Sequence, residues 1–367
     1  MKKNTSQKII YQLRIARDRY KRKARGLQKK KAHPKAPVSR GGGSTFLRIE
    51  APAHIDLYKP GNFLPTIDFL NNLRNAYGVQ RSSVVICFRN TISITAAAGL
   101  LLIAEVDKLV KLYGNSTLTC NRPNPVRKKY GALNNTVECV LNQIGFFKLI
   151  GMRERVLNAP HNVTCWDYSS GEVTESQMAG ELLKKIENLV SKEVSAALYK
   201  GAIEAMANSV EHGYIEERND GTGYTDKRWW MFASVMSGQL VIIVCDLGVG
   251  IPNTLHKTQP PSLLQAIMDK WKIVEKGDAA WIKAATLVKE TRTEHGHRGK
   301  GGTDLRSLLQ VSKGAKLSIF SNKGYYELKN LMTKNGMNKA FDFAVENRES
   351  IKGTIVQWSV PVGSIQE

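Results

Sequence analysis

Three short segments in the second half of the chain each combine glycine or asparagine with charged side chains. Their surroundings differ: the first lies in a predicted helix, the second at the end of a predicted strand, and the third in a glycine-rich loop before another helix. The three segments are Glu204–Tyr214, Cys245–Pro252 and Glu294–Leu305.

The first segment ends a run of good helix formers. Apolar residues recur at every fourth position from Val194 to Val210 without an intervening proline, which predicts a helix. Glu204 and Asn208 are four residues apart and therefore share one face. The Asn208 carbonyl oxygen suits Mg²⁺, which prefers oxygen ligands, and Glu204 can orient or deprotonate a nucleophile. An ordinary polar helix face is the alternative interpretation.

The second segment follows an apolar run, Gln239–Cys245, that is typical of a buried strand. Asp246 comes at the end of this run, where a carboxylate can accept a hydrogen bond from the exocyclic amine of a purine. Gly248 and Gly250 follow, and glycine permits a close approach of the backbone to a ligand. A strand that simply ends in a glycine turn is the common alternative.

The third segment is basic as well as glycine-rich, since residues 296–302 read Gly-His-Arg-Gly-Lys-Gly-Gly. A predicted helix, Thr303–Val311, follows directly, and the N–H groups at such a helix start can hold an anion. The spacing is not that of a Walker A loop. A solvated basic loop is the alternative.

Together with a late predicted strand, Lys352–Pro361, these segments resemble the GHKL family of ATP-binding domains, which includes histidine kinases, anti-sigma-factor serine kinases, gyrase B and MutL. The resemblance covers Met178–Val362, and the His-Gly-Tyr that ends the first segment is most similar to the anti-sigma serine-kinase branch. Gly302 departs from that branch, which usually has leucine there. The matching positions are Glu204 and Asn208 in the N box, Asp246, Gly248 and Gly250 in the first glycine box, Gly299–Gly301 in the second, and Gly353 with Thr354 in the late Gly-Thr pair.

The resemblance implies a Bergerat-type α/β sandwich at residues 160–367 that binds ATP with Mg²⁺. Carried over to this chain, it implies that Asp246 reads adenine, Asn208 holds Mg²⁺ and Glu204 is the catalytic base. The glycine loop is expected to cradle the phosphates. The remaining nucleotide contacts are predicted for Gly248, Gly250, Arg298, Gly299, Lys300, Gly301 and Thr354.

Residues 45–155 are predicted to be a separate α/β domain with a mainly parallel sheet, because predicted strands and helices alternate. They resemble the STAS domain of anti-sigma-factor antagonists. That family accepts phosphate on a serine just before a Gly-Leu pair, but Ala97 and Ala98 stand here and have no hydroxyl group. The domain is therefore predicted to bind a protein partner rather than to switch by phosphorylation. The motifs that carry the resemblance are Phe88–Asn90, Ala98–Leu100 and Asn142–Phe146.

The net charge of +22 is concentrated at the start of the chain. Residues 1–40 contain 15 Lys or Arg and one acid, Asp18, and residues 1–44 are predicted to be a basic arm and linker. Such an arm could bind nucleic acid through the phosphate backbone, with release of counterions. It could also lie on anionic lipid, although it has few large apolar anchors. A solvated tail without a dedicated partner is the alternative.

Composition predicts a cytoplasmic protein without a membrane span. The five cysteines show no metal-binding spacing and fit a reducing compartment, and no apolar run reaches about 18 residues. Three functions remain open. The first is ATP hydrolysis that drives a conformational or assembly switch, which could take place in a homo-oligomer. The second is transfer of phosphate to a serine or threonine of another protein. The third is ATP sensing without catalysis in a nucleic-acid-linked system such as phage defence.

Overall fold

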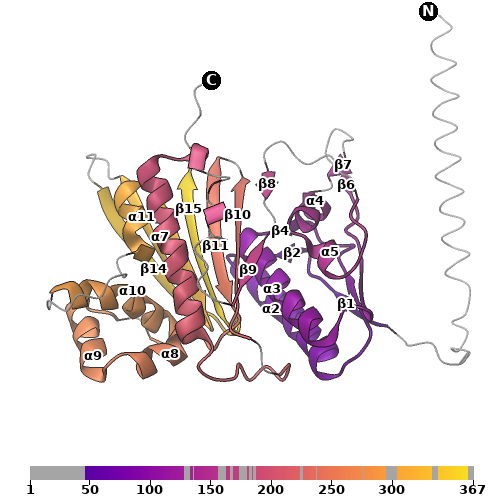
Figure 1. Cartoon of the computed structure of the whole chain (residues 1–367), viewed down its shortest axis with the longest axis horizontal. Coiled ribbons are helices and arrows are strands. Elements are labelled where there is room, and N and C mark those ends of the chain that lie inside the picture. Colours follow the sequence, from indigo (N-terminus) through magenta and orange to yellow (C-terminus); the bar gives the residue numbers. More distant parts are fainter. Residues whose placement is uncertain are drawn as a thin grey trace, which may run out of the picture. The chain divides into compact units, whose positions relative to one another are not determined.

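The computed structural model describes residues 46–362 with gaps, and these residues belong to one compact unit, Phe46–Glu367. The unit combines helices with a parallel sheet and a separate antiparallel sheet (Figure 1), which confirms the α/β prediction. The predicted arm, residues 1–44, lies outside the described residues. The gaps are residues 128–132, 135, 156–162, 166–167, 173–179, 182–183, 185–186, 224–225, 237, 275, 295–303 and 333–337.

A three-stranded parallel sheet, in the order β1-β3-β5, forms the N-terminal part of the unit. The parallel arrangement agrees with the sequence prediction and follows from the helices that connect successive strands. Helix α3 spans Ala96–Tyr113, and α2 (Pro60–Leu73) continues into a π-helical segment, Arg74–Val79. The other elements here are β1 (Leu47–Glu50), β2 (His54–Ile55), β3 (Val84–Cys87), β4 (Ser93–Ile94), β5 (Leu118–Asn121), β6 (Val126–Arg127), β7 (Leu133–Asn134), α4 (Thr136–Gln143) and α5 (Phe146–Leu149).

The larger sheet is antiparallel throughout and has the strand order β14-β13-β12-β15-β11-β10-β8, with β9 beside β10. Strand β11 confirms the predicted apolar strand, and it pairs along its whole length with β10 and β15. The polar residue at its end is therefore held by two neighbouring strands. The strands are β8 (Val163–Cys165), β9 (Ser169–Gly171), β10 (Trp229–Met236), β11 (Gln239–Asp246), β12 (Lys316–Ser321), β13 (Gly324–Met332), β14 (Asn338–Glu346) and β15 (Thr354–Pro361).

Helices α7 (Lys192–Asn208) and α11 (Asp304–Val311) pack on each other and on one face of this sheet. Helix α7 begins at Ser191, whose side chain accepts the N–H of Val194 and so caps the helix. Apolar residues of the two helices and the sheet form one core. After Gly250 the chain forms three helices, α8 (Ile251–Thr258), α9 (Pro261–Lys270) and α10 (Asp278–Glu294), which share a smaller apolar cluster.

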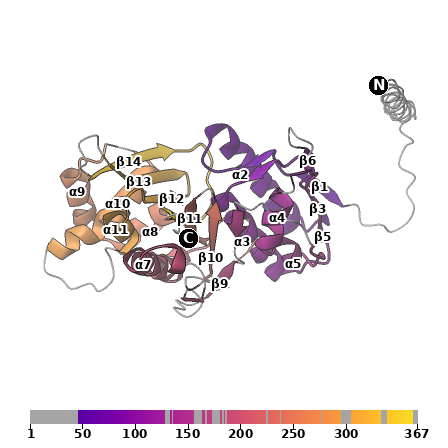
Figure 2. The same ribbon diagram turned by 90° about the horizontal axis from the view of Figure 1, so that it is seen from above.

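Helix α3 covers the opposite face of the antiparallel sheet, against β10 and β11 (Figure 2). One apolar cluster runs from Ile86 of the parallel sheet through Leu102 of α3 to Trp230 and Ile243 of the antiparallel sheet. A continuous core therefore spans the predicted boundary between residues 155 and 160.

Cys87, Cys120, Cys139 and Cys245 are free thiols and all four are buried. Burial raises the pKa of the Cys120 thiol to about 12, so this sulfur is an unreactive packing group at neutral pH. Within the described part of the chain, no helix combines the length and the apolar composition that crossing a bilayer requires.

Candidate functional site

The polar end of α7 meets the carboxyl end of β11. After Asn208 the helix widens into a π-helical turn, Ser209–Gly213, a form often found at functional sites. The Ser209 Oγ atom lies 2.8 Å from the carbonyl oxygen of Ala205 and 3.2 Å from Asp246 Oδ2. The first two sequence segments are therefore direct neighbours in the fold.

Asp246 is buried, with 6% of its surface exposed, and its hydrogen-bond partners are neutral. Its Oδ1 atom accepts the N–H of Gly248 at 2.9 Å, and its Oδ2 atom faces the hydroxyl of Ser209. Burial raises the pKa of the Asp246 carboxyl to about 6, against the opposing effects of its hydrogen bonds and of the positive charge on Arg218. A further donor that arrived with a ligand would stabilise the ionised carboxylate.

The backbone after Asp246 passes the π-helical turn at very short range. The N–H of Val249 donates to the Gly213 carbonyl oxygen at 2.8 Å, and a Cβ at Gly248 would stand 2.1 Å from that same oxygen. Gly250 begins α8 with a φ of 87°, a conformation that favours glycine. The close backbone approach at Gly248 and the positive φ at Gly250 therefore each require glycine without any ligand, and they fix the path of the segment beside Asp246.

A row of polar side chains crosses three strands at the level of Asp246. Asp246 is opposite Thr354 of β15, and Thr354 is opposite Ser321 of β12. The hydroxyl oxygens of Ser321 and Thr354 are 3.0 Å apart, and Ser321 Oγ accepts the N–H of Ile251 at 2.8 Å. The row therefore connects the predicted Gly-Thr pair to the start of α8.

Glu204 and Asn208 face each other on α7, since Asn208 Nδ2 donates to Glu204 Oε1 at 3.1 Å. This hydrogen bond leaves Oδ1 as the Asn208 atom that a cation would meet. The described residues contain no group of three His, Cys, Asp or Glu side chains able to hold a metal ion. Mg²⁺ would therefore depend on the phosphate oxygens of a ligand and on water as well as on Asn208, which is usual for this ion.

The third sequence segment falls largely outside the described residues. Residues 295–303 are not described, so the structure places none of Arg298, Gly299, Lys300 and Gly301. Helix α11 begins directly after them, packs on α7, and is attached to β15 by a 2.9 Å hydrogen bond from Trp358 Nε1 to the Leu305 carbonyl oxygen.

The structure adds Ser209, Tyr214 and Ser321 to the candidate site. The Tyr214 hydroxyl accepts the N–H of Leu247 at 3.0 Å and donates to the carbonyl oxygen of Arg228. The sequence pointed to Tyr214, because it ends the first of the three segments, Glu204–Tyr214. Ser209 and Ser321 had none, because a helix distortion and a strand register determine their positions.

Comparison with known proteins gives no family assignment. No protein-family model matches the chain, and no curated protein sequence matches it. The resemblances to the GHKL and STAS families therefore stay predictions.

Proposed function

We propose that this chain binds ATP together with Mg²⁺ and hydrolyses it to drive a conformational or assembly switch. In this proposal the antiparallel sheet with α7 and α11 is a Bergerat-type nucleotide domain. The environment of Asp246 carries the proposal: a buried carboxylate whose hydrogen-bond partners are neutral stands at a strand end, next to the helix that bears Glu204 and Asn208. The exocyclic amine of adenine is a neutral donor of the kind that such a carboxylate accepts.

The proposal gives each candidate residue a role. Asp246 accepts the adenine amine, and Thr354, Gly248 and Gly250 shape the backbone around it. Glu204 orients or deprotonates the attacking water. Mg²⁺, when bound, neutralises charge on the phosphates, and Asn208 Oδ1 is its protein ligand. The remaining residues, Arg298, Gly299, Lys300 and Gly301, are proposed to hold the phosphates through N–H groups and positive charge.

The start of α3 bears on the choice between hydrolysis and phosphate transfer. Ala97 and Ala98 occupy the positions where a STAS-like domain would carry its phosphorylated serine, and both are fully buried. Without a hydroxyl group they cannot accept phosphate, which favours hydrolysis over transfer within the chain. Transfer to a serine or threonine of a separate protein is the second candidate, because Glu204–Tyr214 resembles the serine-kinase branch.

Titration calorimetry of the full-length protein with ATP and Mg²⁺ tests the proposal. We expect binding at pH 7.5 that weakens below pH 6, by up to about tenfold per pH unit, because protonation removes the charged acceptor at Asp246. Phosphate groups titrate in the same range, so Asp246→Asn is measured alongside and should show a smaller pH dependence. Absence of ATP binding at pH 7.5 would contradict the proposal.

The fate of the γ-phosphate then separates the candidate functions. Release of labelled phosphate by the protein alone indicates hydrolysis, and transfer of the label to another protein indicates a kinase. Binding with neither outcome leaves ATP sensing.

The basic arm gives a prediction about nucleic acid. Fifteen Lys or Arg among residues 1–40 would repel one another unless neutralised, and a phosphate backbone supplies that neutralisation. Full-length protein should bind labelled duplex or single-stranded nucleic acid with little sequence preference, and its affinity should fall steeply with salt. A variant without residues 1–40 should lose most of this binding. Equal binding by both proteins would place the nucleic-acid surface elsewhere.

A further inference from the structure

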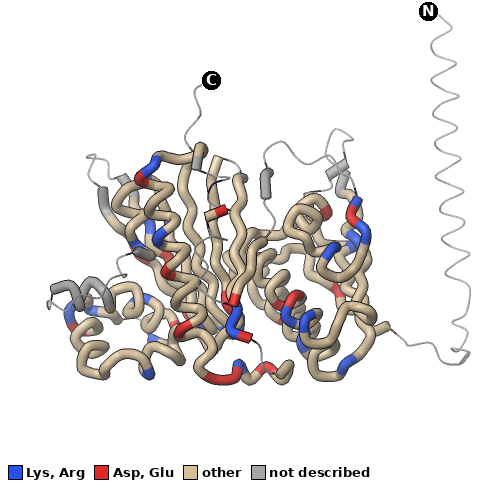
Figure 3. The backbone as a smooth tube through the Cα atoms, in the orientation of Figure 1, with Lys and Arg blue, Asp and Glu red and all other residues tan. Residues whose placement is uncertain are grey.

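Helix α3 carries charged residues on the side that packs against the antiparallel sheet. Figure 3 shows acidic and basic residues next to one another on this helix. Glu105 and Lys108 are each only 1% exposed. Side chains of this kind are almost never buried so completely unless they are paired, so their partners indicate what they do.

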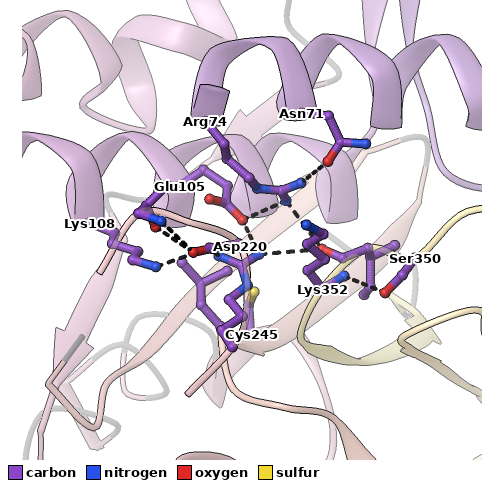
Figure 4. A network of polar contacts seen from close by, with 12 residues as sticks. Asn71, Arg74, Glu105, Lys108, Asp220, Cys245, Ser350 and Lys352 are labelled. Atoms are coloured by element: carbon purple, nitrogen blue, oxygen red, sulfur yellow. Dashed lines mark hydrogen bonds and ion pairs between the residues drawn. The ribbon is translucent and has the colours of Figure 1, made fainter. Parts of the chain in front are cut away.

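Glu105 accepts hydrogen bonds from two arginines that come from distant segments, one of which is Arg74 (Figure 4). Arg74, the first residue of the π-helical extension of α2, donates from Nη2 to Glu105 Oε1 at 2.7 Å. Arg218, from the loop after the π-helical turn of α7, donates to the same oxygen. Burial alone raises the pKa of the Glu105 carboxyl, but the two guanidinium groups outweigh it and hold the pKa at about 2. Glu105 is therefore ionised at any physiological pH.

The same two guanidinium groups also bind the backbone just before β15. Nη2 of Arg74 and Nη2 of Arg218 donate to the carbonyl oxygen of Ile351, at 3.3 Å and 3.5 Å. Ile351 opens a turn of three residues, 351–353, that leads into β15. Glu105 thus holds two arginines in place, and the arginines hold this turn.

The turn of residues 351–353 lies directly against Asp246. A Cβ at Gly353 would stand 2.3 Å from the Asp246 carbonyl oxygen. Lys352 has a φ of 55°, which residues other than glycine rarely adopt, so its surroundings must keep it there. The next residue, Thr354, pairs with Asp246 in the sheet. A displacement of the turn would therefore change the position of the proposed adenine-reading residue and of its neighbour.

A second buried carboxylate fixes Arg218. Asp220 Oδ2 lies 3.0 Å from Arg218 Nη1 and 3.1 Å from Lys108 Nζ of α3. Its Oδ1 atom accepts the N–H and the hydroxyl of Thr222, at 2.9 Å and 2.7 Å. Apolar side chains could fill the same space without the desolvation cost of buried charges. Apolar residues, however, could not donate the hydrogen bonds that fix the Ile351 carbonyl oxygen.

We propose that Glu105, acting through Arg74 and Arg218, positions the turn of residues 351–353 behind Asp246, so that α3 supports the nucleotide site from the opposite face of the sheet. This inference rests on the proposed function, because it takes Asp246 to be the adenine-reading residue. Glu105 acts through Arg74 and Arg218 and is therefore a positioning residue. The layer formed by α3 is then a part of the nucleotide site, and not a detachable partner of it.

The test compares Glu105→Gln with the matched variant Glu138→Gln in the full-length protein. Glu138 is also buried and also pairs with two arginines, Arg122 at 2.9 Å and Arg155 at 3.6 Å, but it belongs to α4, which packs on α5 and β4. Backbone hydrogen exchange is measured without nucleotide, and ATP affinity by calorimetry. For Glu105→Gln we expect faster exchange at residues 351–354 and an affinity about three- to thirty-fold lower. Glu138→Gln should change neither quantity.

A second variant, Arg74→Lys, keeps the positive charge but loses the planar guanidinium, whose Nη2 atom reaches Glu105 and Ile351 while Nη1 is held by Asn71. It should show the same local increase in exchange, and it serves if Glu105→Gln does not fold. The positioning role would be overturned if hydrogen exchange at residues 351–354 were unchanged in the folded variants. It would also be overturned if Glu138→Gln increased exchange at these residues as much as Glu105→Gln does. Hydrogen exchange is measured without nucleotide, so it tests the positioning role even if the wild-type protein does not bind ATP. Failure to bind ATP would overturn the proposed function and not the positioning role.

Discussion

Asp246→Asn is expected to weaken ATP binding by at least about tenfold and, at the same time, to make the nucleotide-free protein more stable at neutral pH. The loss of affinity follows from the loss of a charge-assisted hydrogen bond to the adenine amine, which contributes about 1.5–3 kcal/mol. The two effects have opposite signs because the buried charge of Asp246 strengthens ATP binding but destabilises the fold when no nucleotide is bound.

The gain in stability comes from removing the cost of burying the Asp246 charge. The pKa of this carboxyl is about 6 in the fold against an ordinary value of 3.8. The fold therefore binds the proton more tightly than the unfolded chain does, and stability falls as the pH rises from about 4 to about 6. Above pH 6 the full cost is present, roughly 3 kcal/mol, and an uncharged asparagine avoids it.

Asparagine can also satisfy the local hydrogen bonds. Its Oδ1 atom can keep the N–H of Gly248, and its Nδ2 atom can donate to Ser209 Oγ, whose own hydrogen can stay with the Ala205 carbonyl oxygen at 2.8 Å. Denaturant unfolding without nucleotide should show the variant more stable by about 2–3 kcal/mol at pH 7.5, with the difference closing toward pH 4. A variant that is less stable than wild type at pH 7.5, or a difference that does not change with pH, would contradict the burial argument.

The parts of the fold that depend on local pattern could be predicted from the sequence. Apolar residues at every fourth position predict α7, and the apolar run predicts β11 with Asp246 at its end; both elements are present. The position of Glu204 and Asn208 on one helix face was also predictable, because residues four apart in a helix share a face.

The rest of the candidate site depends on contacts between distant segments, which no local pattern encodes. The π-helical turn at Ser209–Gly213 has no propensity signal, although it brings α7 onto Asp246. Ser321 reaches Thr354 only through the pairing of β12 with β15.

The charged residues of α3 show the same limit. In the sequence Glu105 and Lys108 look like the solvated side of an amphipathic helix, yet both are buried against the antiparallel sheet. Their partners, Arg74, Arg218 and Asp220, come from other segments and are found only in the folded chain.

Glu204→Ala is expected to keep ATP binding and to lose about 10²–10⁴-fold in turnover, because positioned proton transfer typically contributes that much. The alanine variant also removes the acceptor of the Asn208 amide, which donates to Glu204 Oε1 at 3.1 Å. Glu204→Gln keeps an acceptor oxygen at the same place but has no carboxylate to take a proton. If Glu204 is the base, the two variants should lose turnover to a similar extent while both retain nucleotide.

Glu211→Gln is the matched control for Glu204, because Glu211 lies on the continuation of the same helix and its side chain is 66% exposed. Phosphate release at saturating ATP and Mg²⁺ gives the turnover, and calorimetry gives the affinity. The control should match the wild type in both. Turnover near the wild-type rate in Glu204→Gln would make Glu204 an ordinary polar residue of α7. Loss of ATP binding in both Glu204 variants would instead show that this carboxylate holds the nucleotide or orders Asn208, and the base would then have to be sought elsewhere in the site.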